Sequence, residues 1–189
     1  FLHKTNTYSN YGYYFVTSDT GTGKKIEEKL IDIPIEATIY PVDEFTDYQV
    51  YELDSINLVN GGKEFYGEVF DEKTAYDFSF LFPNIVGNEN SATARLDVAA
   101  YSYSRSTFTW KLDGGQTQNL PVNQVSQIDY YAKGNRGTKT ASFTPQQDKL
   151  IFNLTYDKPK ENSKGYLNFI EVNARRKLSV HGAVMQFQK

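Results

Sequence analysis

The sequence predicts an all-β protein, namely a β-sandwich of jelly-roll type. First, Tyr, Phe, Val, Ile and Thr recur in short runs that Gly, Asn, Asp and Pro interrupt, as strands and turns require. Second, the turns follow one another at the spacing of roughly 8 to 12 residues that is typical of sandwiches. Third, there is neither an alternation of strands with helices nor a repeat of roughly 20 to 50 residues, which excludes nucleotide-binding α/β folds and solenoids.

The first part of the chain predicts two strands joined by a tight turn. Residues 11–18 (YGYYFVTS) form an aromatic and β-branched run, and residues 24–33 alternate apolar with charged residues. The glycines between them suit a turn. Residues 20–25 (TGTGKK) superficially resemble a phosphate-binding loop, but Lys25 stands where that motif requires Ser or Thr, and no helix is predicted to follow. We therefore interpret this segment as a hairpin turn.

The next part of the chain predicts three more strands. In residues 48–58 (YQVYELDSINL) a helix competes, because the apolar spacing is mixed, but we favour a strand. Residues 60–62 (NGG) supply a turn in which glycine can adopt a positive φ. The strand pattern resumes at residues 65–70 and again at residues 75–82, where Pro83 ends it.

The alternation becomes regular from residue 92 onward. Every second residue from Ala94 to Ala100 is expected to face the core, and the residues between them, from Arg95 to Tyr101, are expected to face outward. Residues 106–112 lead into Asp113-Gly114-Gly115, a strong hairpin signal, and the return strand is expected at residues 116–122.

The remaining segments complete a set of about eleven or twelve strands. We expect strands at residues 126–132 and 139–144, on either side of a turn at residues 134–137 (GNRG). Two more are expected, one in which Leu150, Phe152, Leu154 and Tyr156 alternate and one over residues 166–178.

The domain organisation has two interpretations. A boundary near residue 86 would separate an N-terminal β unit, residues 1–85, from the sandwich proper, residues 86–189. Alternatively, the N-terminal unit is part of the same domain, because the linker-like segments at residues 86–92 and 157–164 are short enough to be loops.

Composition and charge exclude several classes of function. The 189 residues include no Cys, which excludes disulfides, thiolate metal sites and a cysteine nucleophile within this chain. The net charge of −3 argues against nucleic acid as a partner. No apolar run approaches the roughly 18 residues of a membrane span. The chain starts with neither Met nor a signal peptide, so we expect it to be a segment of a longer protein.

No combination of residues identifies a catalytic or metal site. The two histidines, His3 and His181, lie near opposite ends, and no Gly-x-Ser-x-Gly motif is present. Asp43, Glu44 and Asp47 could bind calcium, but a solvated acidic loop is the favoured interpretation. A second acidic set could act as a glycosidase pair, although strand-edge charges explain it better; it comprises Glu52, Asp54, Glu64 and Glu68. We therefore assign no catalytic residue, metal or cofactor.

Aromatic residues are the strongest candidates for a binding site. They make up 15% of the chain, and a row of them on one face of a sandwich could stack on sugar rings or anchor a partner protein. The candidates are Tyr101, Tyr103, Trp110, Tyr130 and Tyr131. The alternative is that such residues fill the core, which the single Trp favours.

Three blocks of residues resemble the region that precedes the catalytic domain in the PorU family, the gingipain-like cysteine peptidases that act as sortases of the type IX secretion system of Bacteroidetes. The first comprises residues 8–9, 13–15 and 21–26 (GTGKKI). The second comprises residues 51–54 (YELD), 57–58 and 62–70 (GKEFYGEVF), and it departs from the family at Lys63-Glu64-Phe65, where Arg-Glu-Trp is expected. The third is residues 165–178 (GYLNFIEVNARRKL).

The resemblance implies an exported protein at the outer membrane or cell surface, one that removes the C-terminal signal of secreted cargo. The Cys/His pair of the family cannot be placed on this chain. We therefore expect a non-catalytic accessory domain. Its partners would be a downstream peptidase domain, outer-membrane or secretion-system proteins, and cargo or a glycan. The alternative is a carbohydrate-binding module of a bacterial surface glycan system, which the aromatic residues would favour.

Overall fold

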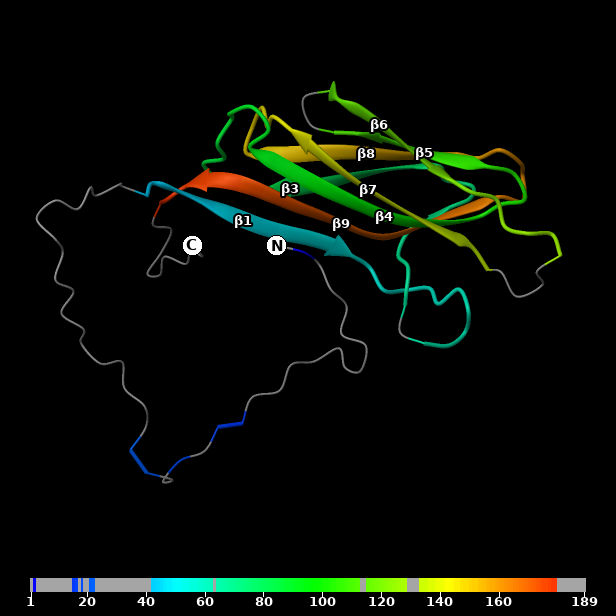
Figure 1. The fold of residues 1–189 in the computed structure, drawn as a ribbon, viewed down its shortest axis with the longest axis horizontal. Helices are drawn as coiled ribbons and strands as arrows, with labels where there is room; N and C mark the ends of the chain where they lie inside the picture. Colours follow the sequence, from blue (N-terminus) through cyan, green and yellow to red (C-terminus); the bar gives the residue numbers. More distant parts are fainter. Residues whose placement is uncertain are drawn as a thin grey trace, which may run out of the picture. The chain divides into compact units, whose positions relative to one another are not determined.

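The structure is a computed structural model of the chain (Figure 1). It describes residues 2, 15–16, 18, 21–22, 42–62, 64–112, 115–128 and 133–179. The two strands and the turn expected before residue 34 fall, apart from isolated positions, outside the described residues, and so do both histidines. The chain divides into two units, of which Thr5–Val42 form one; everything below concerns the other, Phe1–Lys4 with Asp43–Lys189.

The described residues contain nine strands and no α-helix. Hence no helix that could span a membrane is found in this part of the chain. The strands are β1 (Glu44–Glu52), β2 (Val69–Phe70), β3 (Ala75–Leu81), β4 (Ala92–Tyr101), β5 (Ser106–Lys111), β6 (Thr117–Val122), β7 (Asn135–Phe143), β8 (Lys149–Asp157) and β9 (Lys164–Lys177).

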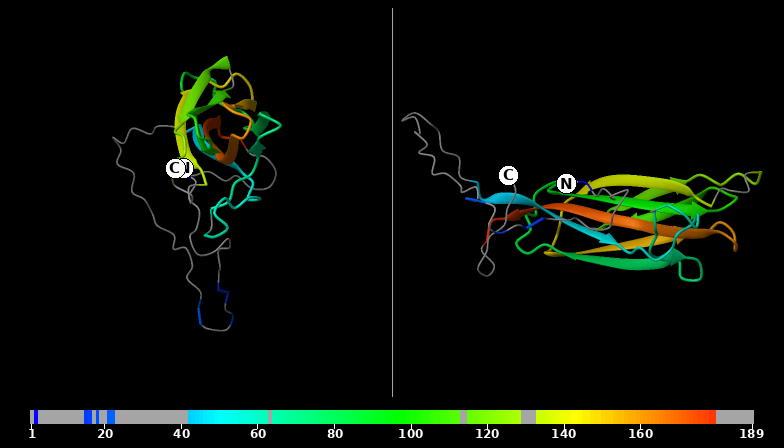
Figure 2. Two further views of the ribbon diagram at one scale, coloured as in Figure 1. Left: turned by 90° about the vertical axis from the view of Figure 1, so that its right-hand side faces the viewer. Right: turned by 90° about the horizontal axis from the view of Figure 1, so that it is seen from below.

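Two antiparallel sheets form a sandwich, which confirms the expected fold class. One sheet has the order β1-β9-β4-β7, with β2 also paired to β9, and the other has the order β3-β8-β5-β6. Viewed end-on, the strands of both sheets surround one core (Figure 2). Because β1, β2 and β3 pair with strands that follow residue 86, residue 86 is not a domain boundary, and residues 43–85 belong to the sandwich.

Aromatic rings fill the space between the sheets. Trp110 and Phe143 both contact the ring of Phe152 edge to face, with centroids 5.8 and 5.5 Å apart, a geometry that aromatic pairs favour. The largest fully buried side chains are Trp110, Tyr156, Phe70, Phe82, Phe108, Phe143, Phe152, Leu96, Leu112, Leu150, Leu154 and Leu167. Most of the described aromatic residues therefore stabilise the sandwich.

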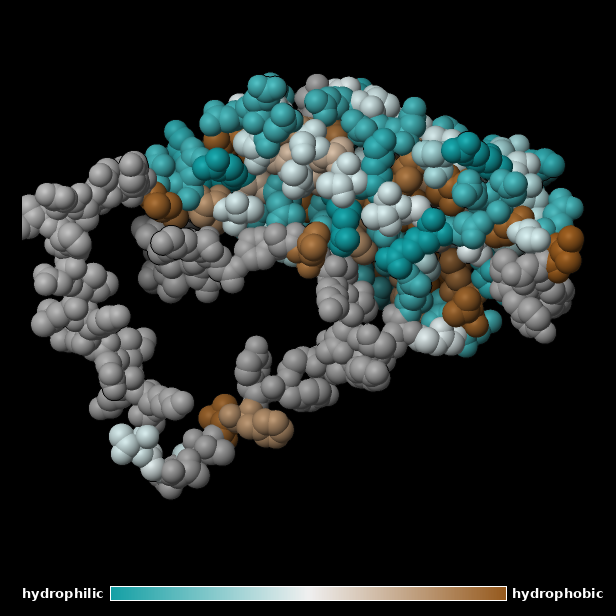
Figure 3. Space-filling view, viewed as in Figure 1, coloured by the Kyte–Doolittle hydropathy of each residue, from teal (hydrophilic) through white to brown (hydrophobic). Residues whose placement is uncertain are grey.

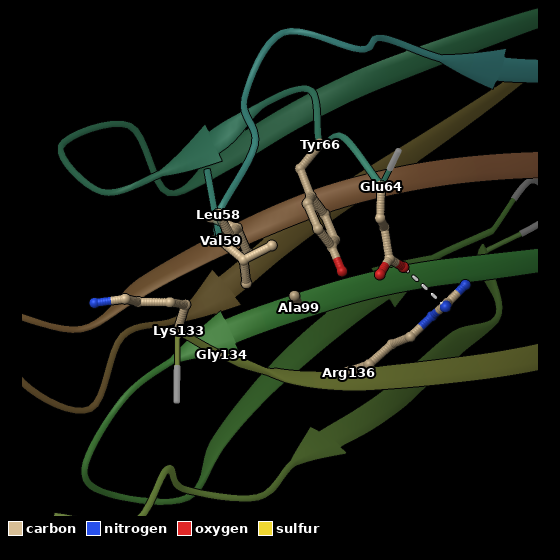
Figure 4. Close-up of a pocket in the computed structure, with 8 residues that line it drawn as sticks. All are labelled: Leu58, Val59, Glu64, Tyr66, Ala99, Lys133, Gly134 and Arg136. Carbon is tan, nitrogen blue, oxygen red and sulfur yellow. Dashed lines mark ion pairs between the residues drawn. The ribbon is translucent and has the colours of Figure 1, made fainter. Parts of the chain in front are cut away.

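The inner face of β4 is as expected, but its outer face differs. Ala94, Leu96, Val98 and Ala100 are buried in the core. On the outer face Asp97 and Ala99 are also buried, each 2% exposed. The segment that joins β1 to β2, residues 53–68, lies over this part of the sheet (Figure 4). The alternation of residues within β4 does not predict that another segment covers its outer face.

Four expectations for local structure differ from the structure. The strand expected at residues 48–58 ends at Glu52, and most of residues 65–70 lies outside β2. Of the strand expected at residues 126–132, the described part, residues 126–128, lies outside any strand. The expected turn at residues 134–137 belongs mostly to β7, because Gly137 pairs with Val98. A Cβ atom at position 137 would lie 3.0 Å from Val122 of the facing sheet, so glycine here serves close packing between sheets.

The turn at residues 60–62 is confirmed. Asn60 and Gly62 have φ values of 54° and 74°, a region that Gly and Asn tolerate best. The side chain of Asn57 fixes the turn, since its Oδ1 atom accepts hydrogen bonds from the backbone N–H groups of Val59 and Gly61, both at 3.1 Å.

A β-bulge interrupts the pairing of β4 with β9. Asp97 pairs with Phe169 and Val98 pairs with Leu167, so Asn168 is the extra residue of β9. Its side-chain amide donates a hydrogen bond to Oδ1 of Asp97 (2.9 Å). Leu167 is fully buried in the core. Bulges redirect side chains, and this one places Asn168 beside Asp97 on the outer face.

Candidate functional site

The five aromatic residues predicted as a binding site do not form one surface. Trp110 is 0% exposed and belongs to the core, so the expectation of an accessible indole is wrong at this position. Its place on the inner face of β5, against Phe152, is the physical reason. Tyr130 and Tyr131 lie outside the described residues.

Tyr101 and Tyr103 do lie together at the surface, at and just beyond the end of β4. Their ring centroids are 5.5 Å apart at an interplanar angle of 65°. Their hydroxyl groups share a hydrogen bond of 2.6 Å, and Tyr103 is 38% exposed. That hydrogen bond raises the pKa of Tyr101, and desolvation adds to the shift. This pair is the part of the predicted site that the structure brings together.

Two further tyrosines extend the pair across the outer face of the sheet. Tyr166 of β9 is paired with Ala99, two residues before Tyr101 on β4. The ring of Tyr166 contacts that of Tyr66 edge to face, with a centroid distance of 6.2 Å. We call Tyr103, Tyr101, Tyr166 and Tyr66 the tyrosine row. It leads from the end of β4 to a pocket on the same face.

The pocket lies between the segment 53–68 and strands β4 and β7 (Figure 4). Its volume is about 180 Å³. Ala99 forms its floor, and the hydroxyl of Tyr66 and the carboxylate of Glu64 both point toward it (Figure 4). The lining residues are Leu58, Val59, Glu64, Tyr66, Ala99, Lys133, Gly134 and Arg136.

A network of charged groups fixes one wall of this pocket. Nε of Arg136 donates to both carboxylate oxygens of Asp97, at 2.8 and 3.0 Å, and Nη1 of Arg136 lies 2.9 Å from Glu64. Asp97 also accepts hydrogen bonds from Thr138 (2.6 Å) and Asn168 (2.9 Å). Because Asp97 is only 2% exposed, these contacts compensate a charge that would otherwise be costly to bury.

The hydroxyl of Tyr66 stays protonated in this environment. Burial raises its pKa above the ordinary value, and the charge of Glu64 raises it further. Tyr66 is 6% exposed. The pocket therefore holds a neutral phenol, a carboxylate and a guanidinium close together.

A second hollow lies on the same sheet, around an ion pair. Arg95 of β4 and Glu171 of β9 approach to 2.8 Å, and the carboxylate of Glu171 is almost fully buried. Tyr48 donates a hydrogen bond of 3.5 Å to Glu171, and the guanidinium of Arg95 lies 4.8 Å from the ring centroid of Phe169. The hollow measures about 260 Å³. Burial raises the pKa of Tyr48, as do the charge and hydrogen bond of Glu171.

Several of the acidic residues considered for calcium binding or hydrolysis are paired with other side chains. Glu44 pairs with Arg175 (2.6 Å), and Asp47 pairs with Arg176 (2.5 Å). These residues belong to β1, so the favoured interpretation of a solvated loop is wrong for them. In the second set, Glu68 accepts a hydrogen bond from Tyr51. In the described ranges no group of three or more potential metal ligands occurs.

The residues of the pocket were not identified from the sequence as a binding site. Glu64 was considered as one member of an acidic set. Arg136 and Asp97 are 39 residues apart in the chain, and Tyr66 and Tyr166 are 100 apart. A sequence signal exists at Arg95 and Asp97, where two charged residues interrupt an apolar strand, but nothing local names their partners.

Comparison with known proteins finds a solved structure that has a similar fold. No family model matches the chain, and neither does any curated protein. Among solved structures, dimeric latent PorU from Porphyromonas gingivalis matches with a TM-score of 0.66 and 18% identity, over 82% of this chain and 15% of that protein. The fold of this chain is thus similar to that of a small part of PorU.

Carbohydrate-binding modules are also similar, but more weakly. The CBM36-1 domain of a multidomain xylanase from the hindgut metagenome of Trinervitermes trinervoides has a TM-score of 0.44 and 8% identity, over 67% of this chain and 96% of that domain. A CBM36 module in complex with calcium and xylotriose has a TM-score of 0.41 and 10% identity, over 69% and 99%. These scores are too low to support an argument about this chain.

Proposed function

We propose that this chain is a non-catalytic accessory β-domain of a PorU-type sortase, a cysteine peptidase of the type IX secretion system. It would position cargo or dock to outer-membrane partners, at the outer membrane or cell surface. The observation that carries the proposal is the structural match to PorU over 82% of the chain. That protein is much longer than this chain, so the activity of the whole protein is part of the proposal.

The location of the residues that resemble the PorU family supports the proposal. Tyr51 pairs with Ile170 and Val69 pairs with Tyr166, which places the second and third blocks of resemblance side by side in one sheet. Two blocks more than 90 residues apart in the sequence therefore form one continuous structural unit. If this chain retains a structural element of the PorU family, the residues that it shares with that family are expected to lie side by side in the fold, as these two blocks do.

The proposal assigns the chemistry to another part of the same protein. This chain has no cysteine, and a cysteine peptidase requires a thiolate nucleophile. The nucleophile and its histidine would belong to a downstream peptidase domain. Against that domain, this sandwich would act as a positioning or docking unit.

The gene and the protein it encodes test this proposal. We expect the sequence that follows Lys189 to encode a caspase-like domain with a Cys and a His. Deleting residues 43–179 from the full protein should then reduce the processing of a cargo protein that carries its C-terminal signal, while a small peptide substrate is still cleaved. A gene without such a domain would refute the proposal.

A second candidate function is carbohydrate binding, which the exposed pair Tyr101 and Tyr103 favours. Tyrosine rings present an apolar face and a polar edge, and this combination suits sugars. The hydroxyl groups of the pair share a hydrogen bond, which restricts the relative orientation of the two rings. Isothermal titration with oligosaccharides tests it: binding that the double substitution Tyr101→Ala and Tyr103→Ala abolishes would support this function.

A further inference from the structure

The pocket beside Tyr66 offers polar groups that are held in fixed positions. Arg136 is fixed by two hydrogen bonds from Nε to the buried Asp97 and by the contact of Nη1 with Glu64. Among the described residues, Nη2 of Arg136 makes no hydrogen bond or ion pair. Pre-organised donors and acceptors bind a ligand without a large cost in side-chain entropy.

The remaining walls of the pocket are apolar. Leu58 and Val59 line one side, Ala99 forms the floor, and the ring of Tyr66 forms another wall (Figure 4). Small-molecule sites typically combine such surfaces with a few well-placed polar groups. A ligand that fits has C–H groups on one face and hydroxyl groups at its edge.

The charges around the pocket balance each other. Glu64 and Arg136 face the pocket with one negative and one positive charge, and Asp97 is buried behind Arg136. The side chain of Lys133 points away from the Glu64–Arg136 pair (Figure 4). A phosphate or a basic peptide would meet one favourable and one unfavourable charge here. A neutral molecule with several hydroxyl groups can use the carboxylate as an acceptor and the guanidinium as a donor.

The tyrosine row continues from the pocket along the same face. Tyr66 lines the pocket and contacts Tyr166, and Tyr101 and Tyr103 follow at the end of β4. On the side of the molecule that Figure 3 shows, hydrophilic residues dominate and hydrophobic ones are scattered. The combination of pocket and row suits a chain of rings better than a large apolar partner surface.

We propose that this pocket binds one neutral sugar ring of a glycan, with its hydroxyl groups on Glu64, Tyr66 and Arg136, and that Tyr101 and Tyr103 contact a neighbouring ring of the same glycan. The inference rests on the second candidate function, and it adds the selective subsite and the class of ligand. The pocket volume of about 180 Å³ is large enough for one such ring.

Titration calorimetry of the full chain with trisaccharides of xylose, glucose, galactose and a uronic acid tests the proposal. Tyr66→Phe removes one hydroxyl group and Glu64→Gln removes one charge, and each should weaken binding of a neutral trisaccharide by about 2- to 10-fold. The double substitution Tyr101→Ala and Tyr103→Ala should weaken it by about 10-fold or more. Glu89→Gln, an exposed carboxylate in the segment between β3 and β4, is the matched control and should have no effect.

The possible outcomes separate the pocket from the tyrosine pair. If the double substitution abolishes binding but Tyr66→Phe and Glu64→Gln leave it unchanged, the pocket proposal is wrong and carbohydrate binding by the pair stands. If only the uronic acid trisaccharide binds, and if its binding depends on salt, the proposal of a neutral ligand is wrong. If no trisaccharide binds at millimolar concentration, both the pocket proposal and the second candidate function are refuted. Equal unfolding midpoints in urea would show that the variants are folded.

Discussion

Replacing Asp97 with Asn should destabilise the protein by about 2 to 3 kcal/mol. The substitution keeps the size of the side chain but removes the charge, and it turns one acceptor oxygen into a donor. Asp97 is 2% exposed and accepts hydrogen bonds from Arg136, Thr138 and Asn168. The new amide would therefore point a donor at another donor.

The magnitude follows from the environment of each partner. Hydrogen bonds to charged groups contribute about 1.5 to 3 kcal/mol each, and breaking a buried ion pair costs about 3 to 5 kcal/mol. The side chain of Arg136 is 51% exposed, so water and Glu64 would solvate its guanidinium after the substitution. Solvent screening lowers the value of such a pair. The expected loss therefore lies near the lower end of the range for a buried pair.

Urea unfolding followed by circular dichroism measures this change as a lower midpoint with an unchanged slope. Asp157→Asn is the matched control, because Asp157 is exposed and accepts a hydrogen bond of 2.9 Å from Thr109; we expect a loss below about 0.5 kcal/mol. A loss that small for Asp97→Asn as well would show that the network contributes little. A double-mutant cycle of Asp97→Asn and Arg136→Met measures the coupling energy between the two side chains.

Three further predictions concern the core and the aromatic residues. The fluorescence of Trp110, fully buried, should resist quenching by iodide, and ready quenching would contradict its burial. Gly165→Ala should cost about 1 to 3 kcal/mol in urea unfolding, because its Cβ would lie 2.7 Å from Phe108, whereas Gly61→Ala meets no atom within 4 Å. Burial raises the pKa of Tyr51 to about 12. The contribution of Tyr51 to the free energy of unfolding should therefore be lost as the pH rises from about 10 through 12. In an alkaline absorbance titration, the ionisation step near pH 12 should be missing from Tyr51→Phe.

The strands that have one core face were predictable from local sequence. In β8, Leu150, Phe152, Leu154 and Tyr156 are all buried, and the residues between them, Ile151, Asn153 and Thr155, are more exposed. A period of two is a property of the strand itself, so no knowledge of the other strands was needed. The sandwich as a whole follows from several such strands and their turns.

Features that depend on distant parts of the chain were not predictable. Gly137 looks like a turn residue, yet it lies in β7, where it pairs with Val98 and where Leu120 and Val122 of the facing sheet approach it closely. The candidate site likewise depends on residues that are far apart in the chain. Tyr101 and Tyr103 are neighbours in sequence and were found, whereas Tyr66 and Arg136 reach the pocket only because the segment 53–68 lies over β4 and β7.

The bulge at Asn168 sets which way the first half of β9 faces. If β9 kept all its residues but paired without the bulge, strict alternation would turn Tyr166 toward the core and Gly165 toward the outside. The tyrosine row would then lose a member, and the space now occupied by Phe108 and Tyr156 next to Gly165 would have to accept a tyrosine. Deleting Asn168, by contrast, would leave Leu167 and Phe169 opposite adjacent residues of β4 and keep Tyr166 on the outer face, so we expect the deletion to cost mainly the hydrogen bond from Asn168 to Asp97.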